Sequence, residues 1–124
     1  MEKQKIKNYK DLVVWQKSMR LATCVYKLVE VFPKNEIFGL SSQVKRSVVS
    51  IPANIAEGSQ RSSRKDFAQF LHMSLGSCAE LETELLIAKQ LCFGKELQYN
   101  EAESLMIEIS KMLKSLIFKL KTQN

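Results

Sequence analysis

The sequence predicts an all-α fold: an antiparallel up-down four-helix bundle whose second helix is kinked by a proline. Two observations support this prediction. Glycine and proline occur only 4 and 2 times in the 124 residues, so the tight turns that an all-β fold needs are scarce. Apolar residues also recur every three or four positions along four long segments, as they do on one face of a helix. Short connections between helices of similar length favour antiparallel neighbours.

The first predicted helix covers residues 9–32 and carries two apolar rows side by side. Pro33 ends it, because the residue before a proline is pushed out of α geometry. The second row makes the apolar surface wider than one core contact requires, so we expect the second row to meet other subunits. The alternative is a wide core face with scattered surface leucines. The first row is Leu12, Trp15, Met19, Ala22, Tyr26 and Val29, and the second is Val14, Leu21, Val25, Leu28 and Phe32.

The second predicted helix covers about residues 38–57 and contains Pro52. A proline inside a helix removes one hydrogen bond and clashes with the carbonyl four residues earlier, here that of Val48, so we expect a kink. Gly58 is expected to cap the helix in a left-handed conformation. The predicted core row is Leu40, Val44, Val48, Ile51 and Ile55, and a polar row beside it is Gln43, Ser47, Ser50, Asn54 and Glu57.

The third predicted helix begins at Ser63, whose hydroxyl can cap it, and Asp66 lies three residues later in a capping-box-like pattern. Gly94 is expected to end the segment. Its predicted core row is Phe67, Leu71, Ser74, Cys78, Leu81, Leu85, Ala88 and Cys92.

The fourth predicted helix begins near Asn100, with Glu103 three residues later. The bundle is expected to cover residues 9–124, after a basic, disordered segment at residues 1–8. The predicted core row of this helix is Ala102, Leu105, Ile109, Met112 and Leu116. A second row, Met106, Leu113, Ile117 and Leu120, is expected to meet other subunits.

The chain has a net charge of +6, and the positive charge is concentrated in particular segments of the sequence. A clustered positive surface attracts phosphate backbones or anionic lipid headgroups, whereas the alternative is an ordinary solvated surface. The free amides at the start of the third helix also favour anions. We therefore predict a nucleic-acid-binding site at Arg61, Arg64 and Lys65, with Lys45. Residues 40–65 hold Lys45, Arg46, Arg61, Arg64 and Lys65 against Glu57, which gives 5 − 1 = +4.

Several classes of function find no support in the sequence. The three cysteines, Cys24, Cys78 and Cys92, are odd in number and lack CxxC spacing, so we predict buried free thiols and neither disulfide nor zinc site. His72 is the single histidine, which argues against a histidine-based metal or catalytic site. No apolar run approaches the roughly 20 residues of a membrane span. We predict a cytoplasmic protein without metal, cofactor or catalytic residues.

Polar residues of the second and third helices form a further candidate site. Buried polar groups need partners, and a hydrogen-bonded network would fix the register between helices or subunits. Alternatively, Asn54, Glu57 and Arg61 form part of a ligand or RNA site at the helix end. An enzyme using Glu57 and Glu80 as paired carboxylates is a third interpretation, with no nucleophile or phosphate loop to accompany them. The predicted network is Arg46, Ser50, Asn54, Glu57, Ser77 and Glu80.

Three segments carry a resemblance to a known family. The segments "DLVVWQKS", "VYKLVEVFPKNEIFGLSSQVKRSVVSIPANIAEG" and "FLHMSLGSCAELETEL" together resemble the four-helix-bundle family of 23S rRNA intervening-sequence proteins. The resemblance implies a bacterial protein similar in fold to the accessory proteins of diversity-generating retroelements, assembling as a homopentamer, with a nucleic-acid-binding role and no enzymatic activity. The chain departs from the family at Met73–Ser77, where an alanine commonly precedes the glycine-serine pair, so we expect different local packing there.

The sequence thus leads to two hypotheses of different kinds. The first is a non-enzymatic, pentameric scaffold that binds RNA or DNA backbones through basic helix ends. The second is a protein-interaction adaptor for a nucleic-acid enzyme such as a reverse transcriptase.

Overall fold

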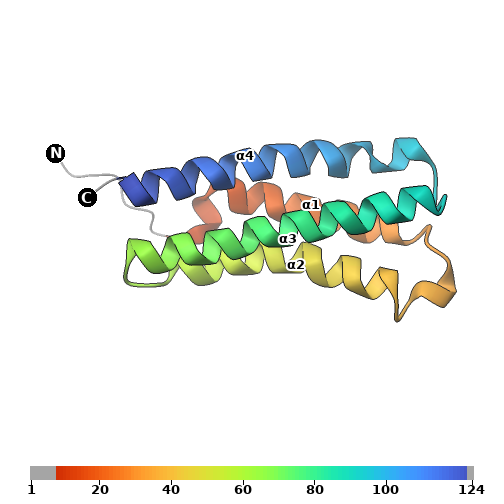
Figure 1. Ribbon diagram of the computed structural model, residues 1–124, viewed down its shortest axis with the longest axis horizontal. Coiled ribbons are helices and arrows are strands. Elements are labelled where there is room, and N and C mark those ends of the chain that lie inside the picture. Colours follow the sequence, from red (N-terminus) through yellow and green to blue (C-terminus); the bar gives the residue numbers. More distant parts are fainter. Residues whose placement is uncertain (1–7, 123–124) are drawn as a thin grey trace.

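The structure, a computed structural model, describes residues 8–122, and every regular element in this range is helical. Four long helices lie side by side (Figure 1), which confirms the predicted four-helix bundle. The prediction for residues 1–7 lies outside the described residues. The long helices are α1 (Val13–Val29), α2 (Leu40–Ser59), α3 (Arg64–Gln90) and α4 (Asn100–Thr122), and the short 3₁₀ helices are η1 (Tyr9–Asp11), η2 (Lys34–Glu36) and η3 (Glu96–Tyr99).

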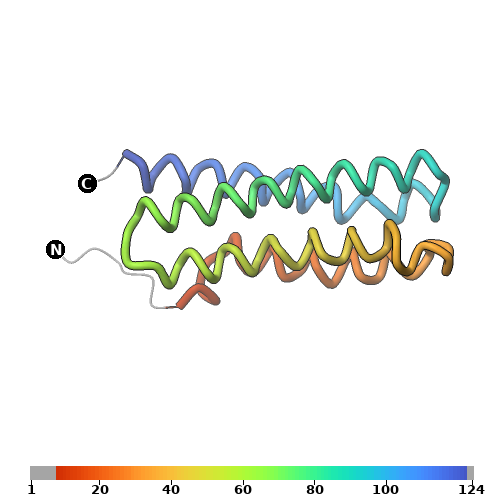
Figure 2. Tube along the Cα trace, turned by 60° about the horizontal axis from the view of Figure 1, so that its bottom comes forward, coloured from red at the N-terminus to blue at the C-terminus, as the bar shows by residue number. Residues whose placement is uncertain are grey.

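The direction of the chain alternates from one long helix to the next, as the colours in Figures 1 and 2 show. α1 and α3 each pack against both α2 and α4, so the four helices enclose one core. Two ends of the bundle follow from this arrangement. The terminal end consists of residues 8–11, 57–66 and 118–122, and the loop end consists of residues 30–39 and 91–99.

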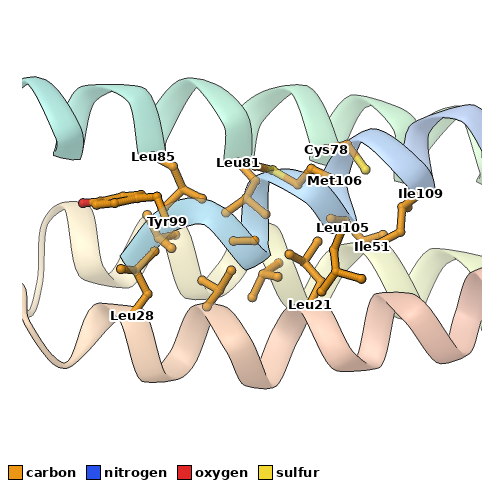
Figure 3. Close-up of a cluster of buried hydrophobic side chains, with 14 of the residues drawn as sticks. Leu21, Leu28, Ile51, Cys78, Leu81, Leu85, Tyr99, Leu105, Met106 and Ile109 are labelled. Carbon is orange, nitrogen blue, oxygen red and sulfur yellow. The ribbon is translucent and has the colours of Figure 1, made fainter. Parts of the chain in front are cut away.

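The core contains apolar side chains from all four helices (Figure 3), but α1 contributes the row that the sequence analysis assigned to other subunits. Val14, Leu21, Val25 and Leu28 are each 4% or less exposed, whereas Met19 and Tyr26 of the first row are exposed. The prediction for these rows is therefore wrong. Its cause is Ser18, a polar residue that interrupts the second row in the sequence yet is fully buried, because its hydroxyl donates to the Val14 carbonyl at 2.7 Å.

The core face of α4 changes from the first predicted row to the second along the helix. Ala102, Leu105 and Ile109 of the first row are buried, and so are Leu113 and Ile117 of the second. A straight helix has 3.6 residues per turn, so a row spaced by threes and fours drifts around it. The prediction that the second row faces other subunits is therefore wrong for this helix as well.

The start of α4 is held by contacts with α3 and with the α3–α4 connection. η3 runs directly into α4, and the Glu103 carboxylate accepts a hydrogen bond from Lys89 of α3 at 2.8 Å. Tyr99 is buried, and its hydroxyl donates to the Phe93 carbonyl at 2.6 Å. This bond ties the α3–α4 connection to the beginning of the last helix.

α2 presents its predicted core row to the interior, since Val44, Val48, Ile51 and Ile55 are fully buried. α2 is continuous through Pro52, and the kink there stays a prediction.

Gly58 does not cap α2 in a left-handed conformation, as the sequence analysis expected. It lies inside the helix, and the positive backbone φ angles in residues 8–122 belong to Cys92 and Gly94. A Cβ atom added to Gly58 would lie 2.7 Å from the Phe70 Cβ and 3.0 Å from the Phe67 Cδ1. The glycine therefore permits the close approach of α2 and α3 beside the turn that joins them.

The two ends of α3 are capped in different ways. The Ser63 hydroxyl accepts a hydrogen bond from the Asp66 amide at 3.1 Å, which confirms the predicted cap. At the other end, the Cys92 and Phe93 amides donate to the carbonyls of Lys89 and Ala88, both at 3.0 Å, as in a Schellman motif. Cys92 occupies the left-handed position of this motif with φ of 60°.

The predicted burial of the three thiols holds for one of them. Cys78 is buried, Cys24 is half-buried and Cys92 is exposed. The core row of α3 stops at Ala88, because the helix ends at Gln90 and the Schellman turn carries Cys92 to the surface.

We expect Cys92→Gly to raise the free energy of unfolding by about 1 kcal/mol, because a residue with a Cβ atom costs roughly 1–2 kcal/mol in the left-handed region. Thermal or urea unfolding measures the change. Cys92→Ala is the matched control, since alanine removes the thiol and keeps the strained Cβ. Equal stability of the glycine and alanine variants would contradict this explanation.

Candidate functional site

A polar groove lies between α2 and α3 and holds half of the predicted network. Its volume is about 420 Å³. Arg46, Ser50 and Glu80 of the predicted network line it, so the two helices bring these residues to one place. The complete lining is Gln43, Arg46, Ser47, Ser50, Glu80 and Glu84.

A chain of hydrogen bonds runs from Ser50 in the groove to neighbouring residues of α2 and α3. The hydroxyls of Ser50 and Ser77 share a hydrogen bond of 2.8 Å, and the Asn54 amide donates to the Ser50 carbonyl at 2.9 Å and hydroxyl at 3.0 Å. Buried Ser74 adds a bond of 2.7 Å from its hydroxyl to the Ile51 carbonyl, next to Pro52. The Ser50–Ser77 and Ser74–Ile51 bonds cross from one helix to the other, and so they favour one register between α2 and α3. The Asn54 bonds stay within α2 and hold Ser50.

Glu57 lies apart from this chain of hydrogen bonds. Its carboxylate accepts a hydrogen bond of 2.7 Å from the Arg61 guanidinium, and both side chains are about half exposed. Gly58, the next residue, contacts Phe67 and Phe70, whereas Glu80 lies ten residues, or about 15 Å, further along α3. The structure therefore does not bring Glu57 and Glu80 together as a carboxylate pair.

Glu84, the most distinctive residue of the groove, is not among the residues predicted from the sequence. Its Oε2 atom accepts a hydrogen bond from Ser47 at 3.2 Å, and its Oε1 atom is buried without a hydrogen-bond partner among the described residues. Burial raises the pKa of Glu84, and the charge of Glu80 adds to the increase, while the Ser47 bond and Arg46 oppose it. The spacing of Ser77, Glu80 and Glu84 by three and four residues is a signal that could have identified it.

We expect Glu84→Gln to stabilise the protein at neutral pH. Because the folded state raises the pKa of this carboxyl above its ordinary value of 4.5, ionisation opposes folding once the pH exceeds that value. Glutamine removes this cost and still accepts the Ser47 bond. The advantage should be full above the raised pKa and vanish below about pH 4. Urea unfolding of both proteins from pH 3.5 to 7.5 measures it; a pH-independent difference would contradict the assignment.

We expect Asn54→Ala to lower the free energy of unfolding by about 1 kcal/mol, because it removes two hydrogen bonds at a half-buried site. Glu57→Ala is the control and should change stability by less than about 0.5 kcal/mol, since it breaks an exposed i,i+4 ion pair. Thermal unfolding measures both. If Asn54→Ala melts like the wild type but loses affinity for a ligand, the residue serves a binding site and not the helix register.

The predicted basic residues divide into a group of three and a single distant one. Arg64 and Lys65 are exposed on the first turn of α3, where unpaired backbone amides favour anions. Arg61 lies close by, with its guanidinium 4.7 Å from the centre of the Phe70 ring and paired with Glu57. Lys45 lies about 21 Å along α2 from the end of this helix at Ser59, with its ammonium 5.1 Å from the centre of the Tyr26 ring.

The fold adds basic residues to the terminal end that the sequence analysis missed. Lys119 and Lys121 come from the last turn of α4 and Lys10 from η1, and these elements lie at the same end as the α2–α3 turn (Figure 2). The antiparallel order of the helices was the signal that could have predicted this. The net charge of the terminal end is 6 − 3 = +3. The six basic residues are Lys10, Arg61, Arg64, Lys65, Lys119 and Lys121, and the three acidic residues are Asp11, Glu57 and Asp66.

Metal binding and membrane insertion can be tested within residues 8–122. No three His, Cys, Asp or Glu side chains in this range gather closely enough to hold a metal ion. None of the described helices combines the length and the apolar character that crossing a membrane requires.

Comparison with known proteins shows similarity to a protein family and to a solved structure. The sequence profile of the 23S rRNA-intervening sequence protein family matches residues 10–115. The chain also resembles the crystal structure of a protein of unknown function from the S23 ribosomal protein family of Bacteroides thetaiotaomicron VPI-5482. The two share 33% sequence identity and a TM-score of 0.78, and the match covers 85% of this chain and 98% of that chain. No curated protein matches the sequence.

Proposed function

The chain belongs to the 23S rRNA-intervening sequence protein family, and on this basis we propose that it is a non-enzymatic, oligomeric scaffold that binds RNA or DNA backbones. The observation that carries the proposal is the charge of +3 at the terminal end, 6 − 3 over residues 8–11, 57–66 and 118–122. The family name connects the protein with ribosomal RNA genes, and we place its action in the cytoplasm, where such RNA resides.

Two physical causes act together at the terminal end. Arg64 and Lys65 supply positive charge, and the first turn of α3 beside them has backbone amides without helical partners. Phosphate groups are attracted by both. Contacts of this kind position a nucleic acid without selecting its sequence, so the proposal is backbone binding and not base recognition.

The oligomeric part of the proposal is supported by apolar side chains on the flanks of the bundle. Met19 and Tyr26 are exposed on α1, and Leu86 and Ile107 are exposed on α3 and α4. A ring of subunits would cover part of this surface and repeat the basic terminal end in every subunit. The number of five subunits is taken from the family resemblance.

The proposal is tested by two measurements on the full chain. Light scattering should give a particle of several 14.2 kDa subunits. Nucleic acid that co-purifies after gentle lysis should be recovered and sequenced, and its affinity for the protein should fall steeply with salt. A stable monomer at micromolar concentration would overturn the oligomer, and the absence of any salt-dependent binding would overturn the scaffold.

A second candidate function, an adaptor for a nucleic-acid enzyme, is favoured by a groove between α3 and α4. The groove has a volume of about 610 Å³, and Leu75, Leu86, Met106 and Ile107 are among the apolar residues that line it. Grooves of this kind accept amphipathic helices of other proteins. A gene beside a reverse transcriptase would favour the adaptor, and a gene inside an rRNA insertion would favour the scaffold.

A further inference from the structure

The loop end of the bundle exposes an unusual amount of apolar surface. Phe38 is 94% exposed and Ile37 is 59% exposed in the α1–α2 connection, and Leu97 is 79% exposed and Leu91 is 54% exposed in the α3–α4 connection. Single exposed apolar residues are ordinary, but a group of large ones at one end of a small domain marks an interaction surface. We call these four residues the apolar tip.

Contacts between the two connections hold the apolar tip in place. The rings of Phe32 and Phe93 pack with their centres 5.4 Å apart, and Val31 lies against Gly94, where an added Cβ would be 2.6 Å from its Cγ2 atom. Within the α1–α2 connection, the Glu36 carboxylate accepts a hydrogen bond from the Leu40 amide at 3.0 Å. A surface that is already ordered loses little conformational entropy when it binds.

The charges around the apolar tip suit a contact with an identical surface. Residues 30–39 hold Lys34 against Glu30 and Glu36, and residues 91–99 hold Lys95 against Glu96, which gives 2 − 3 = −1 for the loop end. A two-fold contact pairs each patch with its own copy, so a nearly neutral patch with both signs allows lysine to face glutamate. Two terminal ends at +3 each would repel one another.

We propose that the apolar tip docks onto the apolar tip of a second copy of this chain, so that particles associate loop end to loop end with their basic terminal ends outward. Four residues per chain make a small contact, because a stable interface has about 20–30 residues on each side. The proposal therefore rests on the oligomer proposed above, because a ring repeats the contact and multivalency strengthens it.

The test compares particle masses by light scattering and sedimentation. Phe38→Ser combined with Leu97→Ser should halve the number of subunits per particle, whereas the control Phe118→Ser, which removes another exposed aromatic residue on α4, should leave it unchanged. Circular dichroism confirms that the variants fold, as substitutions at exposed sites should allow.

The outcomes separate this inference from the proposed function. A wild-type particle with the mass of a monomer overturns the ring of the proposed function, whereas a ring whose mass is the same in the double variant overturns tip docking alone. Affinity for nucleic acid per subunit should be retained by the double variant. Equal masses for the wild type and the double variant overturn the proposal, and that is also the result expected if the apolar tip serves a different protein.

Discussion

Replacing Gly58 by alanine is expected to lower the free energy of unfolding by about 1–3 kcal/mol, as overpacking in a close contact does. The new Cβ would approach the Phe70 Cβ to 2.7 Å and the Phe67 backbone carbonyl to 3.3 Å, and neither atom lies at the end of a flexible side chain. α2 and α3 must therefore move apart beside their turn. Urea unfolding measures the loss of stability.

The matched control is Gly76→Ala, in the middle of α3, whereas Gly58 lies one residue before the end of α2. An added Cβ at Gly76 meets nothing within 4 Å among the described residues, so alanine should stabilise the subunit by about 0.5–1 kcal/mol through its higher helix propensity. The two substitutions are chemically identical and are predicted to have opposite signs. If Gly58→Ala is neutral or stabilising, the close approach of the helices is not what requires glycine there.

Removing four charges from the terminal end is expected to weaken nucleic-acid binding about tenfold or more at low salt. The variant replaces Arg64, Lys65, Lys119 and Lys121 by glutamine, and all four side chains are exposed, so helicity should remain. Each phosphate contact contributes about −0.9 to the slope of log K against log salt on duplex DNA and about −0.7 on single strands. The slope should therefore become shallower together with the loss of affinity.

The control variant removes the same charge from elsewhere on the molecule. It replaces four exposed basic residues outside both ends of the bundle, Arg20, Lys27, Lys111 and Lys114, by glutamine. Fluorescence anisotropy with a labelled duplex and a labelled single strand, over a range of salt, compares the two variants. If both lose affinity to the same extent, the attraction comes from the overall charge and the terminal end has no special role.

The helices themselves could be predicted because their signals are local in the sequence. The row of Val44, Val48, Ile51 and Ile55 is uninterrupted, and the Ser63 cap depends on residues three positions apart. The core face of α1 could not be predicted in this way. Ser18 interrupts the core row of α1 in the sequence, and only the structure shows its buried hydroxyl bonded to a carbonyl of its own helix.

The candidate site was predicted where its residues follow helical spacing, and it was missed where the contacts come from another helix. Ser50, Asn54 and Ser77 follow helical spacing, and their side chains meet as expected. Glu84 acquires its character from burial against Ser47 on another helix, and Lys119 joins the basic terminal end only through the order of the four helices. Gly58 was misassigned because a glycine near a helix end commonly serves as a cap, and only the neighbouring helix reveals the close contact.

The alternating direction of the helices has a consequence for how the chain folds. Three of the four helix pairs that enclose the core, α1–α2, α2–α3 and α3–α4, join helices that are consecutive in the sequence. Such local pairs close short loops, and bundles dominated by them fold in microseconds to milliseconds. α1–α4 is the exception, because Lys17 and Glu108 are 91 positions apart when they meet. We expect this pair to dock last, so substitutions there should accelerate unfolding and leave the folding rate nearly unchanged.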